Sequence, residues 1–404
     1  MKQKNYNPFL ILAAGCCILS ACSKMDEYKK FTGDKEISYT GKADSVIAYS
    51  GKNRINLSWL RSSDPKVAKT RIYWKNRTDS VEVPLNNSVP GSRRLNAIIN
   101  NLPEGSYNFE LFNFDNLGNT SVVSRVSGVA YGATFQQSLL NRGIESFYAR
   151  QFNIGYNAAV QWFASAEKSI GVEVSYMDSA GVTRKVIGDP KLSSTHLPKY
   201  DERNPISYRT MFLPDSTAID TFYTAAASKT VNTLLPNQVH IKNPGNPFIA
   251  EKMVGRWGTL ADWITTTPVK NHDGGVGGID NLNTSTQRLL SFEFWGTPAI
   301  VNGKVYQTGS LPAGSYRLVV TTENINNNLE NSYISVAKGS ILPDVANISQ
   351  SVVNLKFINN MSNKDLTLSF TLTQFELISL GVVSTMQQVN ESSLRIRSFK
   401  LFKD

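Results

Sequence analysis

Short stretches in which apolar and polar residues alternate recur along this chain, and turn-forming residues separate them. Residues 170–176 alternate in this way, as do residues 353–357 and 366–372. Successive side chains of a strand point to opposite faces, so a period of two residues predicts β-strands with one buried face. Long stretches with the helical period are nearly absent. The chain is therefore predicted to be all-β and built of sandwiches or jelly rolls.

The first predicted module covers residues 41–132. Residues 55–59 alternate and end in Trp59, and residues 102–107 read Leu-Pro-Glu-Gly-Ser-Tyr. Both segments resemble parts of a fibronectin type III domain. The resemblance implies an early strand that buries Trp59. It also implies a tyrosine corner, in which the Tyr107 hydroxyl donates a hydrogen bond to upstream backbone.

Residues 133–240 are predicted to form a second β-sandwich. Residues 170–176 and 182–186 have the pattern of two strands, and a turn sequence at residues 178–181 joins them. An immunoglobulin-like or fibronectin-like sandwich is the expected fold, although the segment lacks a tyrosine corner like that of the first module.

The third predicted module covers residues 245–404. Residues 244–247, Pro-Gly-Asn-Pro, mark its start because two prolines and a glycine cannot continue a strand ladder. Residues 311–316, Leu-Pro-Ala-Gly-Ser-Tyr, nearly repeat the earlier corner, and the final alternation slips by one residue between Ile396 and Phe399. A β-domain of this size that ends in a strand resembles the galactose-binding or carbohydrate-binding jelly roll. Periodicity alone leaves an immunoglobulin-like sandwich open.

Residues 1–21 have the pattern of an export signal. A positively charged start is followed by an apolar run over residues 9–19 and by small residues before Cys22. The segment resembles a bacterial lipoprotein signal, which implies cleavage before Cys22 and acylation of its thiol. An ordinary secretory signal that contains a cysteine is the alternative. Acidic residues just after Cys22 resemble the surface-export signal of Bacteroidetes lipoproteins, so a polar stalk over residues 22–40 is expected to join an outer-membrane lipid anchor to modules that face the exterior.

The composition narrows the classes of partner. The formal net charge is +10, but lysines and arginines are dispersed, whereas a nucleic-acid interface needs a clustered basic stripe. No nucleic-acid partner is therefore expected. The positive charge is then explained either by a solvated basic surface or by attraction to anionic glycans or lipid phosphates. Cys16, Cys17 and Cys22 are the only cysteines, so cleavage leaves one thiol and no disulfide.

Taken whole, the chain resembles multidomain Bacteroidetes lipoproteins built from domains of unknown function. The resemblance rests on residues 19–22, 54–59 and 102–107, and on two segments of the third module, residues 255–258 and 295–298. It implies capture of a polysaccharide or oligosaccharide, and association with an outer-membrane glycan transporter complex.

Aromatic residues cluster at the start of the third module, where Trp257, Trp263 and Trp295 flank a glycine-rich loop. Glycan sites combine flat aromatic faces with amides and carboxylates, and tryptophan offers a large rigid contact area. Alternation places Glu293 and Trp295 on one face of a strand. Burial of these tryptophans in the core is the competing interpretation. The candidate glycan-binding residues are Trp257, Trp263, Asn271, His272, Asp273, Glu293 and Trp295.

No cofactor is expected, apart from a structural calcium ion. The sequence offers only weak candidate ligands for it, which are Asp273, Asp280 and Asn281. A glycosidase needs two carboxylates across a cleft, and Glu293 has no closely spaced partner in the sequence. The sequence therefore predicts a glycan-binding surface lipoprotein without enzymatic activity. The alternative is an adhesive or structural protein that binds another protein through its sandwich modules.

Overall fold

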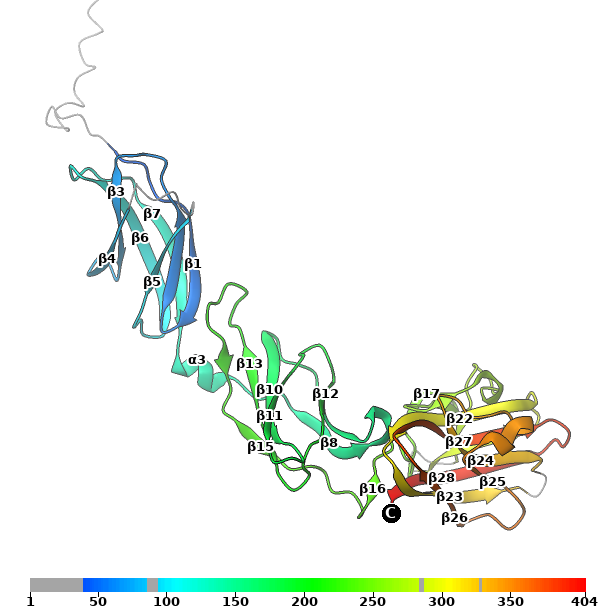
Figure 1. Cartoon of the computed structure of the whole chain (residues 1–404). Coiled ribbons are helices and arrows are strands. Elements are labelled where there is room, and N and C mark those ends of the chain that lie inside the picture. The colour runs from blue at the N-terminus through cyan, green and yellow to red at the C-terminus, as the bar shows by residue number, and fades with distance from the viewer. Residues whose placement is uncertain (1–38, 86–93, 283–286, 327–328) are drawn as a thin grey trace, which may run out of the picture. The chain divides into compact units, whose positions relative to one another are not determined.

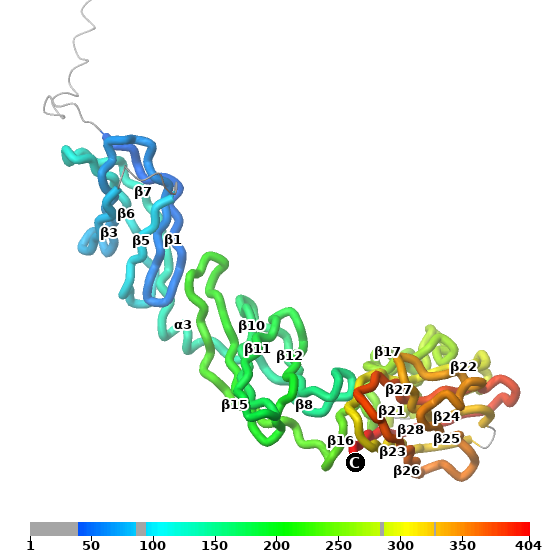
Figure 2. The backbone as a smooth tube through the Cα atoms, in the orientation of Figure 1, coloured from blue at the N-terminus to red at the C-terminus, as the bar shows by residue number. Residues whose placement is uncertain are grey.

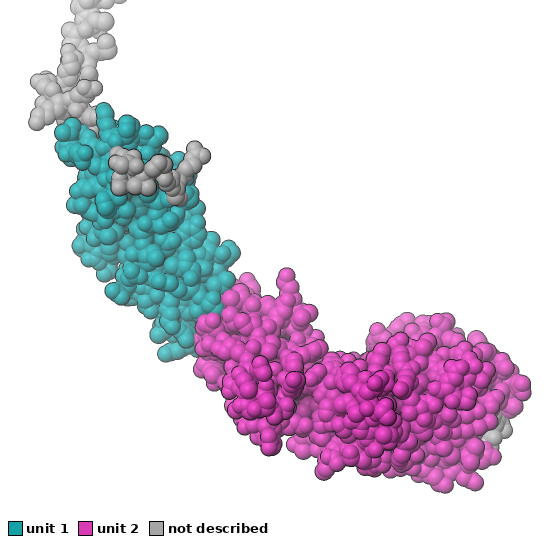
Figure 3. Space-filling view, viewed as in Figure 1, with its two compact units in different colours: residues 1–138, 213–222 teal, residues 139–212, 223–404 magenta. Residues whose placement is uncertain are grey.

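The computed structural model describes residues 39–85, 94–282, 287–326 and 329–404, and the chain divides into two compact units (Figures 1 and 3). Unit 1 consists of Met1–Ser138 with Leu213–Phe222, and unit 2 consists of Leu139–Phe212 with Tyr223–Asp404. The predicted signal segment and Cys22 lie outside the described residues. Strands dominate both units, so the all-β prediction is confirmed. Among the described residues, no helix is long and apolar enough to cross a membrane.

Unit 1 contains a sandwich of seven strands. One layer has the order β1-β2-β5 and the other has the order β4-β3-β6-β7, and the end of β1 also pairs in parallel with β7. A short helix, α3 (Ala133–Ser138), follows the last strand. The strands are β1 (Asp44–Lys52), β2 (Ile55–Leu60), β3 (Val67–Trp74), β4 (Asp79–Pro84), β5 (Arg94–Ile99), β6 (Gly105–Asp115) and β7 (Ser124–Tyr131).

Both features that the first module was predicted to share with fibronectin type III domains are present. Trp59 lies on β2 and is fully buried in the core between the layers. The Tyr107 hydroxyl donates a hydrogen bond to the Pro103 carbonyl oxygen at 2.8 Å, which confirms the tyrosine corner. The corner ties the start of β6 to the loop before it.

The second sandwich repeats the strand order of the first. β8, β9 and β12 form one sheet in the order β12-β9-β8, and the other sheet has the order β11-β10-β13-β14 with β15 paired to β13. The predicted fibronectin-like fold is thus observed without its corner tyrosine. The strands are β8 (Ile144–Gln151), β9 (Asn157–Trp162), β10 (Ser169–Met177), β11 (Thr183–Gly188), β12 (Ser194–Leu197), β13 (Ile206–Phe212), β14 (Phe222–Tyr223) and β15 (Ala227–Lys229).

Residues 213–222 belong to unit 1, although they lie within the predicted second module. Asp220 explains the assignment. Its carboxylate accepts hydrogen bonds from the Arg54 guanidinium at 2.6 and 2.9 Å and from the Lys52 backbone N–H at 2.8 Å. The Ile219 backbone N–H also donates to the Ser50 carbonyl at 2.8 Å. The segment is therefore held against β1 and the turn that follows it.

The third sandwich packs two antiparallel sheets over one large core. The larger sheet has the order β17-β18-β20-β21-β28-β23-β26, with β16 paired to β28, and the smaller has the order β19-β22-β27-β24-β25. The C-terminal strand β28 thus lies in the middle of the larger sheet (Figure 2). The larger sheet contains β16 (Gln238–Val239), β17 (Ala250–Val254), β18 (Trp257–Leu260), β20 (Gly278–Asn281), β21 (Arg288–Phe294), β23 (Gly314–Ile325), β26 (Asp365–Leu372) and β28 (Ser392–Lys403). The smaller contains β19 (Ile264–Thr265), β22 (Ile300–Leu311), β24 (Asn331–Lys338), β25 (Val353–Lys356) and β27 (Glu376–Met386).

The second tyrosine corner is also present. The Tyr316 hydroxyl donates to the Pro312 carbonyl oxygen at 2.7 Å, and its ring is fully buried. A two-sheet sandwich is therefore observed for the third module, while the resemblance to galactose-binding jelly rolls stays a prediction.

The described residues also include three short 3-10 helices, and the first of them, η1 (Phe152–Ile154), joins the two sandwiches of unit 2. The others are η2 (Thr267–Val269) and η3 (Val345–Gln350). Phe152 follows β8 but is fully buried in the core of the third sandwich. A Cβ added at Gly309 on β22 would lie 2.1 Å from the Phe152 carbonyl oxygen, so this approach needs a glycine. The junction therefore depends on Phe152 and Gly309.

We expect Phe152→Ala to lower the free energy of unfolding of the third sandwich by about 3–5 kcal/mol, because it leaves a cavity in a closed core. Urea unfolding of the full chain, followed by tryptophan fluorescence, measures the change. Phe163→Ala is the matched control, since Phe163 is an exposed aromatic side chain of the second sandwich. Equal effects of the two substitutions would contradict the buried junction.

His240 lies at this junction, where its carbonyl oxygen accepts a hydrogen bond from the Phe152 backbone N–H at 2.9 Å. Its ring stacks on Tyr148, and burial together with the nearby Lys242 charge lowers the pKa of His240 to about 4. An unfolded histidine titrates near 6.5, so the unfolded chain binds more protons between these values. The contribution of His240 to stability is complete above pH 6.5 and is lost as the pH falls toward 4. Thermal unfolding across this window should show a smaller decline for His240→Phe, and His196→Phe, at an exposed histidine, is the matched control.

Candidate functional site

The face of the larger sheet that points away from the core of the third sandwich carries charged side chains that pair with one another. On β21, Leu290 and Phe292 face the core, so Glu293 faces outward. On β28, Ile396 faces the core between Arg395 and Arg397. Strand alternation therefore brings a carboxylate and two guanidinium groups to the same surface.

Arg395 joins two buried carboxylates on this face. Its Nε lies 2.7 Å from an Asp280 oxygen and its Nη2 lies 2.8 Å from a Glu293 oxygen. Arg256 binds both oxygens of Asp280, at 2.5 and 2.6 Å. Asp280 has no exposed surface, and burial raises the pKa of Glu293 against the opposing effect of Arg395. The four side chains form a charge network in which each carboxylate is neutralised by an arginine.

Next to this network, two neighbouring strands carry β-bulges. Thr321 pairs with Ser398 and Thr322 pairs with Ile396, so Arg397 has no partner in the register. The next pair joins Asn324 to Arg395, so Glu323 has none either. The two bulged residues form an ion pair with each other. Bulges change the direction of side chains and are common beside functional sites.

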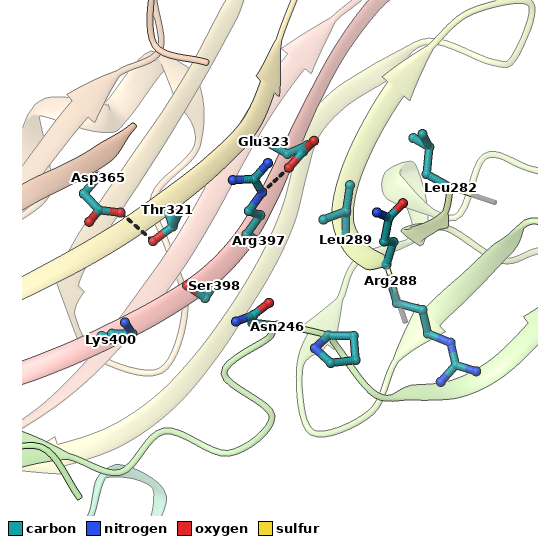
Figure 4. A pocket seen from close by; sticks show the side chains of 12 residues that line it. Asn246, Leu282, Arg288, Leu289, Thr321, Glu323, Asp365, Arg397, Ser398 and Lys400 are labelled. Carbon is teal, nitrogen blue, oxygen red and sulfur yellow. Dashed lines mark hydrogen bonds and ion pairs between the residues drawn. The ribbon is translucent and has the colours of Figure 1, made fainter. Parts of the chain in front are cut away.

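A pocket of about 700 Å³ opens over the paired bulges (Figure 4). This volume falls in the range of about 300–1,000 Å³ that is typical of ligand pockets. Hydroxyl, amide and charged groups make up most of the lining, which suits a strongly hydrated ligand. The lining residues are Asn246 and Pro247 from the turn before β17, Leu282, Gln287, Arg288 and Leu289 on the β20–β21 side, Thr321 and Glu323 on β23, Asp365 on β26, and Arg397, Ser398 and Lys400 on β28.

The turn at residues 244–247, predicted as a module boundary, forms one wall of the pocket. The Phe399 backbone N–H donates to the Pro244 carbonyl at 2.8 Å, and Gly245 forms a bridge with Ser398. Gly245 has a φ of 92°, and a Cβ there would lie 2.3 Å from the Arg397 carbonyl oxygen. Only glycine allows this turn to lie against the bulge in β28.

The three predicted tryptophans have different environments, and one prediction is wrong. Trp263 is 5% exposed and packs against Phe248 and Phe399 in the core, so its ring cannot serve as a glycan platform. Trp257 is half-buried, and its ring stacks on the His272 ring with 3.6 Å between the ring centroids. Trp295 is 51% exposed and follows the end of β21. Of the three, Trp295 alone presents a largely open ring.

The polar residues of the predicted glycan-binding site mainly make contacts within the protein. The Asn271 amide nitrogen donates to the carbonyl oxygens of Glu293 and Pro298 at 2.8 and 2.9 Å, which fixes the loop after β21. Burial against Trp257 lowers the pKa of His272. Asp273 is exposed. None of the seven predicted glycan-binding residues lines the pocket.

The candidate calcium ligands do not converge either. Both oxygens of Asp280 accept hydrogen bonds from arginines, and Asp273 is exposed on the preceding loop. Among the described residues, no group of three or more histidine, cysteine, aspartate or glutamate side chains is placed to hold a metal ion. Asn281 lies at the end of β20, and its side-chain oxygen is buried without a partner.

None of the predicted site residues marks the pocket, although two features of the sequence point to it. The alternation slip between Ile396 and Phe399 is the bulge at Arg397, and the turn at residues 244–247 is a pocket wall. Neither signal could identify Glu323 or Asp365, because these residues reach the pocket only through the pairing of β23 with β26 and β28.

The fold and the site define a protein of three β-sandwiches with a polar pocket on the last. Residues 22–222 match the model of a domain of unknown function (DUF4998), and residues 242–381 match a second domain of unknown function (DUF5013). These matches confirm the resemblance to proteins built from such domains. No curated protein matches the chain.

Solved structures with similar folds include fibronectin and adhesin domains. A segment of two fibronectin type III domains from chicken tenascin is 16% identical, with coverage of 48% of this chain and 99% of that chain and a TM-score of 0.20. Fibronectin domains of chicken CNTN1 are 12% identical, with coverage of 48% and 69% and a TM-score of 0.27. A cleaved adhesin domain of Lys-gingipain from Porphyromonas gingivalis is 10% identical, with coverage of 35% and 92% and a TM-score of 0.25. Because these scores are low, the fold is assigned from the strand order.

We expect Asp280→Ala to destabilise the third sandwich by about 3 kcal/mol, because it leaves Arg395 without one of its two buried partners. Urea unfolding of the full chain measures the change. The matched control is Asp262→Ala, since Asp262 is an exposed partner of Lys242 at 3.9 Å and its loss should cost less than about 1 kcal/mol. A loss at Asp280 no larger than that at Asp262 would argue against a buried charge network.

Proposed function

We propose that this chain is a surface lipoprotein that binds glycans in the pocket of its third sandwich. The observation that carries the proposal is the polar pocket of about 700 Å³ over the paired bulges. Sugars present many hydroxyl groups, each of which donates and accepts hydrogen bonds. Carboxylates, amides, hydroxyls and guanidinium groups supply both kinds of partner.

The supporting residues lie on a rigid surface. Thr321, Ser398 and Lys400 belong to strands in the middle of a sheet whose opposite face is fully packed. The charge network of Asp280, Arg395 and Glu293 holds the neighbouring strands together. Sites built on paired strands keep their geometry better than sites on loops, which favours selective binding of a polar ligand.

Binding without turnover fits the carboxylates of this face best. Arg395 bonds to both Asp280 and Glu293 and so occupies the space between the two carboxylates. A glycosidase needs the space between its carboxylates for the sugar linkage and for water. The same two residues therefore fit a structural role beneath a binding surface.

The proposed location follows from the N-terminal sequence. Acylation of Cys22 would anchor the chain in the outer membrane, and the described sandwiches would then lie on the exterior side. Anchoring by acyl chains is stable when more than one chain is attached. An outer-membrane glycan transporter complex is the proposed recipient of the captured glycan.

Affinity electrophoresis of the full chain in gels that contain single polysaccharides tests the proposal. At least one polysaccharide should slow migration, and Thr321→Trp should abolish the effect because an indole at this position fills the pocket. Thr371→Trp is the matched control, since Thr371 lies on the exposed face of the same sheet and outside the pocket lining.

Normal migration of the unsubstituted chain in every gel would refute glycan binding. Retained binding by Thr321→Trp would place the glycan elsewhere on the protein. Loss of binding by Thr371→Trp as well would show that the effect of the first substitution is not local.

A further inference from the structure

The charges in the pocket are unevenly paired, and this unevenness bears on which glycan is bound. At its centre, Arg397 forms an ion pair with Glu323 and donates to the Asn363 side-chain oxygen at 2.9 Å. Glu323 neutralises the charge of Arg397, and Asn363 satisfies a further donor of its guanidinium group. A ligand charge would have to displace Glu323 before it could bind Arg397.

Arg288 and Lys400 are different, because neither side chain has a hydrogen-bond or ion-pair partner among the described residues. The Nε of Arg288 is buried as well as unpaired. A buried donor without an acceptor costs free energy, so an acceptor supplied by a ligand is favoured there. Arg288 and Lys400 are thus open positions for negative charge.

The two open positions are separated. Figure 4 shows Lys400 and Arg288 at opposite sides of the pocket, with Asn246 between them. A chain of sugars with acidic groups on different units can place one group at each end.

The remaining lining balances the charge and provides uncharged partners. Three cations, Arg288, Arg397 and Lys400, face two carboxylates, Glu323 and Asp365. Asp365 accepts a hydrogen bond from the Thr321 hydroxyl at 2.7 Å and keeps further acceptor capacity for sugar hydroxyls. The pocket therefore has an excess of positive charge without being uniformly basic.

We propose that the pocket binds an anionic oligosaccharide with acidic groups on separate sugars, and that Arg288 and Lys400 each bind one of these groups. The inference rests on the proposed glycan-binding function and names the class of glycan. Carboxylate and sulfate groups share the required chemistry, since both accept the paired N–H donors of a guanidinium group.

Titration calorimetry of the full chain with three oligosaccharide probes tests the inference. Oligogalacturonate carries carboxylates, sulfated dextran oligosaccharide carries sulfates, and unmodified dextran oligosaccharide is neutral. Arg288→Gln and Lys400→Gln should each weaken binding of the anionic probe by roughly ten- to a hundredfold, because hydrogen bonds between charged groups are strong. Lys229→Gln, which removes the same charge from an exposed position on β15, should leave binding unchanged.

The outcomes distinguish the preference for an anionic glycan from glycan binding itself. Tight binding of oligogalacturonate, of the sulfated probe or of both, with losses in the Arg288 and Lys400 variants, supports the inference and identifies the acidic group. Tighter binding of the neutral probe, or equal losses for neutral and anionic probes, overturns the inference but leaves glycan binding intact. If these probes and a wider panel of neutral polysaccharides all fail to bind, the proposed function itself is wrong. Unchanged thermal unfolding of each variant excludes a general loss of structure.

Discussion

The bonds from Arg395 to Asp280 and Glu293 are the interaction on which the solvent face of the larger sheet depends. β28 lies between β21 and β23, so a side chain on its outer face is surrounded by both neighbours. A charge in such a place must be neutralised locally, because an unpaired buried charge is costly. Asp280 and Glu293 provide this neutralisation from β20 and β21. Two residues further along β28, Arg397 and Glu323 form a second pair at the bulges, and the pocket opens there.

The same sheet explains why a binding surface can be both polar and rigid. Its inner face belongs to the largest core of the chain, so the strands cannot shift without disturbing many packed side chains. Phe152 extends this core to the second sandwich, and Gly309 allows the close approach. The pocket is therefore supported by packing from within and by ion pairs from outside, which is the arrangement that selective recognition of a hydrated ligand requires.

Local sequence features predicted the parts of the fold that depend on neighbouring residues. The phrases at residues 102–107 and 311–316 predicted turns, and both tyrosine hydroxyls bond to the proline carbonyl four residues earlier. The alternation slip before Phe399 corresponds to a bulge. The tryptophan cluster was a poorer guide, because a tryptophan side chain suits both a core and a sugar platform. Trp263 belongs to the core, where its Nε1–H donates to the Asn243 carbonyl oxygen at 2.8 Å.

The all-β class, the two tyrosine corners and the turn at residues 244–247 could be predicted from the sequence, because strand period and turn chemistry are properties of short segments. The contacts between charged residues depend on the folded sheet. Glu323 and Arg397 are 74 residues apart, and Asp280 and Arg395 are 115 apart. Their pairing depends on the order of strands in the sheet, and strand order is set by the packing of the whole core. The pocket therefore depends on the pairing of β23 with β28, which no local feature of the sequence predicts.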